Sequence, residues 1–159
     1  LAKAYISNLS VDTIICLEGT EIIGAFLARE LAKEGHTSIN SGKDICVITP
    51  ETNANNQMIF RDNIQKHVFN KQILLLISSA STGKTINRSV ECLQYYNGQL
   101  AGVASIFSAI NEHNGIQINS IFTSEDLNNY ETMSAHDCKL CKSGQKVDAI
   151  INSFGYSKI

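Results

Sequence analysis

The sequence lacks most features of membrane, secreted and nucleic-acid-binding proteins. It has one proline and no tryptophan among 159 residues, and no internal repeat or low-complexity linker. Its longest aliphatic run, Ile73 to Ile77, is far too short to span a bilayer, and no signal-like segment is seen. The formal net charge is -2 and there is no lysine or arginine run, which disfavours a nucleic-acid partner. We therefore expect a globular cytoplasmic protein without a membrane or nucleic-acid partner.

Cysteine is present in an odd number, which argues against a framework of disulfides. The five cysteines are scattered through the chain, as expected for reduced thiols of a cytosolic protein. Cys138 and Cys141 form a C-x-x-C pair that could give two thiolates to zinc, but a second pair at suitable spacing is missing. A turn without metal is the alternative interpretation of this pair.

Apolar runs typical of buried strands alternate with amphipathic segments typical of helices. The expected strands are residues 13–17, 45–49, 73–77, 100–108 and 116–123. Strands separated by helices predict a three-layer α/β/α fold with a mainly parallel five-stranded sheet. Residues 1–123 would form this α/β core, and residues 124–159 an accessory segment packed on the same domain. The polar residues 51–70 predict a long exposed loop.

The first predicted helix follows a Glu18-Gly19-Thr20 turn. Thr20 is a residue type that caps helices with its side chain. Four apolar residues then recur at helical spacing and predict the buried face of this helix: Ile23, Phe26, Leu27 and Leu31.

The segment Ile73 to Thr85 predicts a phosphate-binding loop. A buried strand runs into the small residues Ser81-Thr82-Gly83-Lys84-Thr85, which open an amphipathic helix. Such a turn directs backbone N–H groups at one point beside the positive end of the helix dipole. A well-capped helix start without a ligand is an alternative. A Walker A loop of an NTPase is a weaker one, because Ser78 stands where its first glycine belongs and no strand ends in a suitable aspartate.

Together, the loop Ser81–Thr85, the turn Cys16–Thr20 and the order of elements resemble the type I phosphoribosyltransferases, in particular the orotate branch. The likeness covers roughly residues 10–123 and implies binding of phosphoribosyl pyrophosphate (PRPP) with Mg²⁺. By resemblance, Ser81 to Thr85 hold the 5′-phosphate, and Glu18, Gly19 and Thr20 hold the pyrophosphate. The family transfers phosphoribose to a base, here orotate or a relative, with release of pyrophosphate, and the family expectation is a homodimer.

The sequence departs from this family at two places. Ile77 and Ser78 occupy the positions of two adjacent acids that hold the ribose hydroxyls and help to position Mg²⁺. In the flexible loop Arg61 and His67 match the family, but the expected lysines fall near Asp62 and Gln65. Arg61, or Lys66 one position away from an expected lysine, could cover the pyrophosphate. Two hypotheses follow. Either the protein is an enzyme in which Glu18, Ser78 or water replaces the acids, or it is a non-catalytic module that binds PRPP or a nucleotide.

Overall fold

The chain is seen in a computed structural model that describes residues 1–35, 37–55, 57–127, 129–134, 136–152 and 155–159. These residues form two compact units, Leu1–Leu127 and Asn128–Ile159. The sequence placed this boundary between residues 123 and 124. The packing of the second unit on the first stays a prediction.

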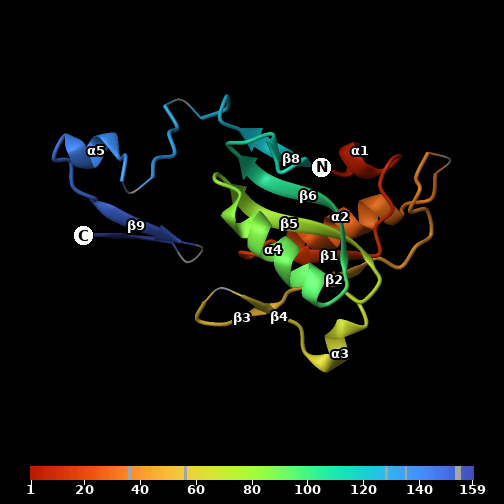
Figure 1. The fold of residues 1–159 in the computed structure, drawn as a ribbon. Helices are drawn as coiled ribbons and strands as arrows, with labels where there is room; N and C mark the ends of the chain where they lie inside the picture. Colours follow the sequence, from red (N-terminus) through yellow and green to blue (C-terminus); the bar gives the residue numbers. More distant parts are fainter. Residues whose placement is uncertain (36, 56, 128, 135, 153–154) are drawn as a thin grey trace. The chain divides into compact units, whose positions relative to one another are not determined.

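The first unit is built on a six-stranded sheet with the order β2-β1-β5-β6-β8-β7 (Figure 1). Its strands are β1 (Thr13–Cys16), β2 (Cys46–Ile48), β5 (Gln72–Ala80), β6 (Gln99–Ser108), β7 (Glu112–His113) and β8 (Ile116–Thr123). All neighbouring pairs are parallel except β7 and β8, which form a short antiparallel hairpin. The predicted parallel sheet of five strands is therefore confirmed, and β7 adds a two-residue strand at its edge.

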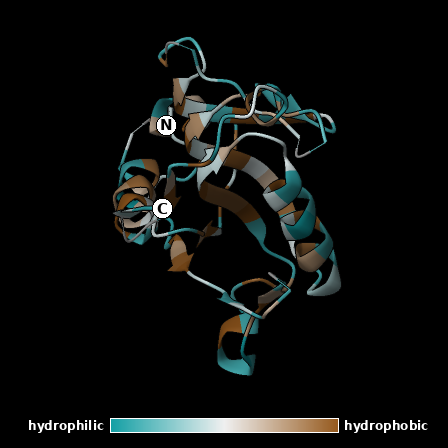
Figure 2. Cartoon of the chain, turned by 90° about the vertical axis from the view of Figure 1, so that its left-hand side faces the viewer, coloured by the Kyte–Doolittle hydropathy of each residue, from teal (hydrophilic) through white to brown (hydrophobic). Residues whose placement is uncertain are grey.

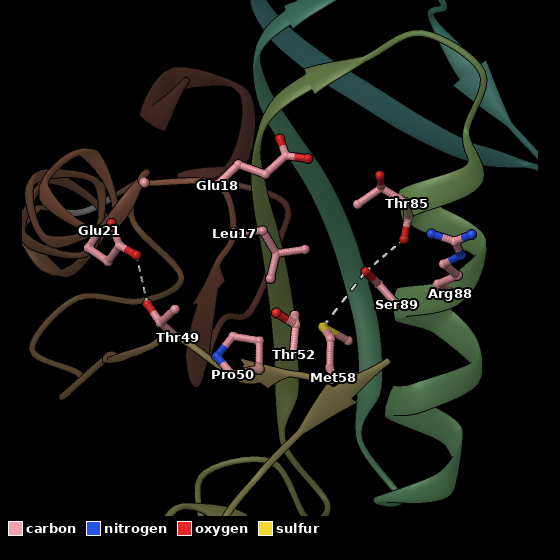
Figure 3. Close-up of a pocket in the computed structure, with 11 residues that line it drawn as sticks. Leu17, Glu18, Glu21, Thr49, Pro50, Thr52, Met58, Thr85, Arg88 and Ser89 are labelled. Carbon is pink, nitrogen blue, oxygen red and sulfur yellow. Dashed lines mark hydrogen bonds between the residues drawn. The ribbon is translucent and has the colours of Figure 1, made fainter. Parts of the chain in front are cut away.

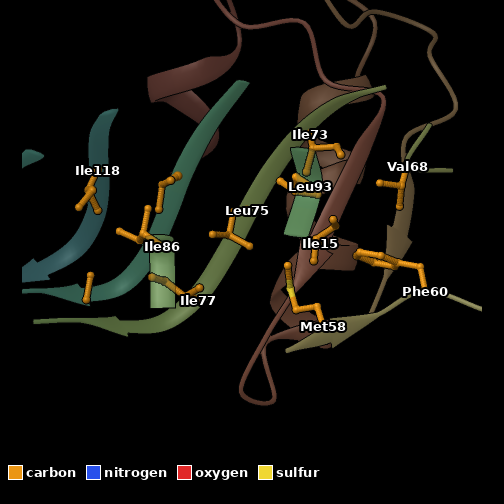
Figure 4. Close-up of a cluster of buried hydrophobic side chains, with 12 residues drawn as sticks. Ile15, Met58, Phe60, Val68, Ile73, Leu75, Ile77, Ile86, Leu93 and Ile118 are labelled. Carbon is orange, nitrogen blue, oxygen red and sulfur yellow. The ribbon is translucent and has the colours of Figure 1, made fainter. Parts of the chain in front are cut away.

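Helices cover both faces of this sheet, which confirms the predicted three layers. Helices α1 (Ala2–Tyr5) and α2 (Glu21–Ala32) lie on one face, and α4 (Lys84–Tyr95) lies on the other (Figure 1). Successive residues of β5 point to opposite faces, so Leu74 and Leu76 join one hydrophobic cluster while Leu75 and Ile77 join the other (Figure 4). In Figure 2 the hydrophobic colours gather on the central strands, while α4 alternates between hydrophobic and hydrophilic residues.

The predicted buried face of α2 is wrong by part of a turn. Leu27 and Leu31 are buried as expected, but Ile23 and Phe26 are exposed. The reason is the small residue Gly24, which brings the helix close to the sheet: a Cβ there would lie 2.3 Å from Cys16 Sγ. The buried stripe is centred on Gly24 and Leu27, and Phe26 turns outward.

The predicted exposed loop of residues 51–70 is also partly wrong. It contains an antiparallel hairpin of β3 (Glu51–Thr52) and β4 (Met58–Ile59), followed by the short helix α3 (Asp62–Gln65). Three apolar side chains of this segment are buried against β5 and α4: Met58, Phe60 and Val68. The Phe60 ring meets Tyr96 of the α4 end edge-on, at 5.1 Å between centroids. Isolated apolar residues thus anchor a segment whose average composition is polar.

The second unit contains the helix α5 (Lys139–Lys142) and a hairpin of β9 (Ala149–Asn152) and β10 (Gly155–Lys158). Helix α5 includes Cys141 and begins directly after Cys138, so the C-x-x-C pair lies at a short helix rather than in a plain turn. Within the described parts of both units, every helix is too short or too polar to cross a membrane.

Candidate functional site

The predicted phosphate loop joins β5 to α4. Strand β5 runs three residues past its expected end and stops at Ala80. The chain then turns through Ser81 and Thr82 to Gly83, which precedes α4 in the left-handed conformation with φ of 73°. Among the described residues, no side chain caps this helix, and no acceptor is found for the N–H groups of residues 81–85. The side-chain cap that the alternative interpretation expected is therefore not seen at this helix start, and the role of the loop in binding phosphate stays a prediction.

The glycine of this loop is covered by a histidine that the sequence did not single out. A Cβ at Gly83 would lie 2.3 Å from the His113 ring, so any larger residue there requires the imidazole or the loop to move. His113 Nε2 in turn lies 2.8 Å from Oδ1 of Asn87 on α4. The hairpin of β7 and β8, with its turn at Asn114 and Gly115, carries His113 to this place. The Asn-Gly pair was a sequence signal for the turn, but nothing in the sequence indicated the contact.

The turn Glu18–Thr20 follows β1 and lies beside the end of β5. The prediction that Thr20 caps α2 with its side chain is wrong: its buried hydroxyl donates to the carbonyls of Leu17 at 2.9 Å and Leu76 at 3.1 Å. These bonds tie the turn to the middle of the sheet. Burial also raises the pKa of the neighbouring Cys16 thiol to about 11, so this sulfur stays protonated at neutral pH.

Ile77 and Ser78, the two positions that lack acids, lie in different surroundings. Ile77 is fully buried in the cluster beneath α4 (Figure 4). The Ser78 side chain points to the opposite face of the strand and contacts Glu18 of the neighbouring turn. Oε2 of Glu18 accepts a bond from the Ser78 hydroxyl and another from the Ser78 backbone N–H at 3.2 Å. A carboxylate is therefore present at this end of β5, although it comes from the turn after β1.

A cavity of about 460 Å³ opens beside these loops (Figure 3). Its lining combines apolar side chains, hydroxyls, two carboxylates and one cation: Leu17, Glu18, Gly19, Glu21, Thr49, Pro50, Thr52, Met58, Thr85, Arg88 and Ser89. A smaller hollow of about 100 Å³ lies over the phosphate loop itself and is lined by Ser81 to Thr85 and also by Glu18. Glu18 thus belongs to both spaces. Arg88 is a cation that sequence reasoning missed, and no ion pair is found for it in the described part of the chain.

The two cations predicted from the flexible loop line neither space. Arg61 makes a bidentate ion pair with Glu51, at 2.7 and 2.6 Å, and this bond raises the pKa of the guanidinium. Lys66 lies near Cys46, at the start of β2, which is the amino end of the parallel strands. The phosphate loop lies at their carboxyl ends. The structure therefore does not bring Arg61 or Lys66 to the predicted site.

No ready-made metal centre exists among the described residues, because no three histidine, cysteine or acidic side chains come together there. Cys138 and Cys141 are close, since the Cys141 N–H donates to Cys138 Sγ at 3.3 Å, and this bond lowers the pKa of the Cys138 thiol. A tetrahedral zinc site needs four ligands, so the pair does not suffice. Mg²⁺ fits better beside Glu18, because this ion often takes one or two carboxylates and completes its shell with ligand phosphates and water.

Comparison with known proteins gives a match only at the level of structure. No family model matches the chain, and neither does any curated protein. An adenine phosphoribosyltransferase from Thermoanaerobacter pseudethanolicus is similar with a TM-score of 0.52 and 16% identity, over 77% of this chain and 75% of that one. A hypoxanthine phosphoribosyltransferase from Staphylococcus aureus has a TM-score of 0.52 and 13% identity, over 77% of this chain and 65% of that one. An adenine phosphoribosyltransferase from Leishmania donovani has a TM-score of 0.51 and 14% identity, over 86% of this chain and 71% of that one. The chain has the type I phosphoribosyltransferase fold.

Proposed function

We propose that this protein binds a phosphoribosyl ligand, either PRPP or a nucleotide, with its 5′-phosphate on residues 81–85. The observation that carries the proposal lies at the start of α4, at the carboxyl end of the sheet. Across the residues that the structure describes, this start has no side-chain cap and the N–H groups of residues 81–85 have no acceptor. A phosphate dianion satisfies several such donors at once and is stabilised by the helix dipole. In parallel α/β sheets ligands bind at this edge, where the turn Glu18–Thr20 also lies.

The cavity beside the loop has room for the rest of such a ligand. Its volume of about 460 Å³ lies within the range of small-molecule sites. Glu18 stands between this cavity and the phosphate loop, so a ligand held by its phosphate would extend past Glu18 into the cavity. Arg88, at the far side of Thr85 on α4, supplies a positive charge for a second phosphate group.

Transfer of phosphoribose to orotate or a related base, with release of pyrophosphate, is the second candidate. The observation in its favour is the mixed lining of the cavity, where Leu17, Pro50 and Met58 offer an apolar surface to a base and Thr49 and Thr52 offer hydroxyls. Against efficient turnover stand the buried Ile77 and the engagement of Arg61 with Glu51. A role as a non-catalytic sensor of PRPP or a nucleotide agrees better with these two facts.

Magnesium would enter this site together with the ligand. The protein offers it the carboxylate of Glu18, and the phosphate oxygens of PRPP would supply further ligands. When bound, the ion neutralises phosphate charge and offsets the repulsion between the ligand and Glu18. We also propose that two copies of the chain form a homodimer, as the resemblance implies, through the exposed apolar side of α2.

Calorimetric titration with PRPP in the presence of Mg²⁺ tests the binding function. We expect saturable binding that inorganic phosphate weakens by competition. Release of pyrophosphate is then measured with orotate, adenine and hypoxanthine as acceptors. Binding without release would reject the enzyme and leave the sensor, whereas the absence of PRPP and nucleotide binding would overturn the whole proposal.

A further inference from the structure

The carboxylate of Glu18 is held in an unusual way. Glu18 has a φ of 58°, a conformation that residues with a long side chain rarely adopt, and it is followed by Gly19 with a φ of 80°. Such backbone strain costs on the order of 1 kcal/mol or more and is typical of functional sites. Here the turn allows the side chain to reach across to the end of the neighbouring strand, sixty residues away in the sequence.

Ser78 fixes the carboxylate through one of its two oxygens. The hydroxyl and the backbone N–H of Ser78 both donate to Oε2 of Glu18. No partner for Oε1 is found among the described residues, so this oxygen is available to a ligand. In Figure 3 the carboxylate extends toward Thr85, and Glu18 lines both the larger cavity and the hollow over the phosphate loop.

We propose that Glu18 binds the ribose hydroxyls of the phosphoribosyl ligand, in place of the acids that positions 77 and 78 lack. This inference rests on the proposed function. Glu18 lines the hollow over residues 81–85, so its carboxylate is near a sugar whose 5-phosphate sits on these residues. An ionised carboxylate accepts hydrogen bonds from hydroxyls with about twice the strength of a neutral acceptor. It therefore favours ribose over a sugar that lacks one of these hydroxyls.

Calorimetry with ribose 5-phosphate, 2-deoxyribose 5-phosphate and inorganic phosphate separates the sugar contact from the phosphate contact. Wild-type protein should bind ribose 5-phosphate about tenfold more tightly than the other two ligands. In Glu18→Gln this preference should fall to about twofold or less, while the affinity for inorganic phosphate stays the same or rises, because a negative charge has been removed. Glu34→Gln, an exposed substitution at the end of α2, is the matched control and should keep the preference.

A second variant tests whether the position of the acid, or only its presence, matters. Adding Ser78→Asp to Glu18→Gln returns a carboxylate to the end of β5 and should restore the preference for ribose 5-phosphate. If Glu18→Gln binds all three ligands with wild-type affinities, Glu18 does not contact the sugar hydroxyls and the inference is overturned. The proposed function then still stands. If wild-type protein binds none of the three, the phosphate site itself is wrong and the proposed function fails with it.

Discussion

At the scale of single residues, the phosphate loop depends on one glycine and the ring above it. Gly83 has both a positive φ and no room for a Cβ, which would lie 2.3 Å from the His113 imidazole. We expect Gly83→Ala to lower the free energy of unfolding by about 1 to 3 kcal/mol and to weaken phosphate binding, because the ring or the loop must move. Urea unfolding and phosphate calorimetry measure the two effects.

Gly35→Ala is the matched control for this substitution. Gly35 lies after α2 with open space around its Cα and no positive φ. Its replacement should leave phosphate affinity unchanged. Adding His113→Ala to Gly83→Ala should recover part of the lost stability, because the obstructing ring is gone. A Gly83→Ala protein with wild-type stability and phosphate affinity would contradict the role given to this glycine.

Arg88 and Arg61 give opposite expectations for PRPP. Arg88 lines the cavity, and the described residues offer it no ion pair, whereas Arg61 is paired with Glu51. Arg88→Ala should raise the dissociation constant for PRPP about tenfold or more, because a charged hydrogen bond to the pyrophosphate is lost. The dissociation constant for ribose 5-phosphate should change little, because this ligand has no pyrophosphate. Arg61→Ala is the comparison and should leave both constants near wild type. If calorimetry shows that Arg61→Ala weakens PRPP binding and Arg88→Ala does not, Arg61 contacts the pyrophosphate, as the sequence predicted.

The sequence located the loop between β5 and α4 at residue level, but not the groups around it. Ser81 to Thr85 were recognisable because glycine and hydroxyl residues follow a buried strand directly along the chain. The contacts of Glu18 with Ser78 and of His113 with Gly83 join residues that are distant in sequence. They depend on strand register and hairpin direction, which local propensity does not encode.

At the scale of elements, the strands were predictable and the edges of the site were not. Buried parallel strands are continuous apolar runs, so β1, β5 and β6 were visible in composition alone. The last three residues of β5 are small or polar and gave no strand signal, although they carry Ser78. The hairpin of β3 and β4 was missed because single residues, Met58 and Phe60, anchor it rather than a periodic pattern.

The phenol of Tyr5 joins helix α1 to the sheet and gives the fold a pH dependence. The Tyr5 hydroxyl donates to the Val103 carbonyl at 2.6 Å, and burial raises the pKa of Tyr5 from 10.0 to about 12. The unfolded chain therefore releases this proton at lower pH than the folded protein does. Stability from Tyr5 is fully present below about pH 10 and is lost as pH rises toward 12.

Tyr5→Phe should remove this pH dependence. At neutral pH the variant should be less stable by about 1 kcal/mol, because the bond to Val103 is lost. Between about pH 10 and 12 the gap should close or reverse, since only wild type loses roughly 1 to 3 kcal/mol through Tyr5. Urea unfolding across this range measures the difference between the two proteins. A difference that stays constant with pH would show that Tyr5 ionises equally in both states.

At the scale of the whole molecule, helix α2 exposes several apolar side chains. Ile22, Ile23 and Phe26 are exposed on neighbouring turns, because the helix packs through Gly24 and Leu27 instead. Arg29 stacks over the Phe26 ring at 4.9 Å, which covers only part of this surface. Adjacent exposed apolar residues of this kind are typical of contact surfaces between subunits. They agree with the homodimer proposed from the resemblance.

Phe26→Glu should convert this dimer to a monomer without unfolding the protein. The Phe26 side chain is 54% exposed, so the substitution disturbs little of the core, but a charge placed against the apolar surface of a second copy carries a large desolvation cost. We expect analytical ultracentrifugation to give a dimer for wild type and a monomer for Phe26→Glu at the same concentration. Phe69→Glu, at a ring that is 56% exposed but lies outside α2, is the matched control and should remain a dimer. If wild type is itself a monomer, the homodimer is wrong; if Phe26→Glu remains a dimer, its interface lies elsewhere than on α2.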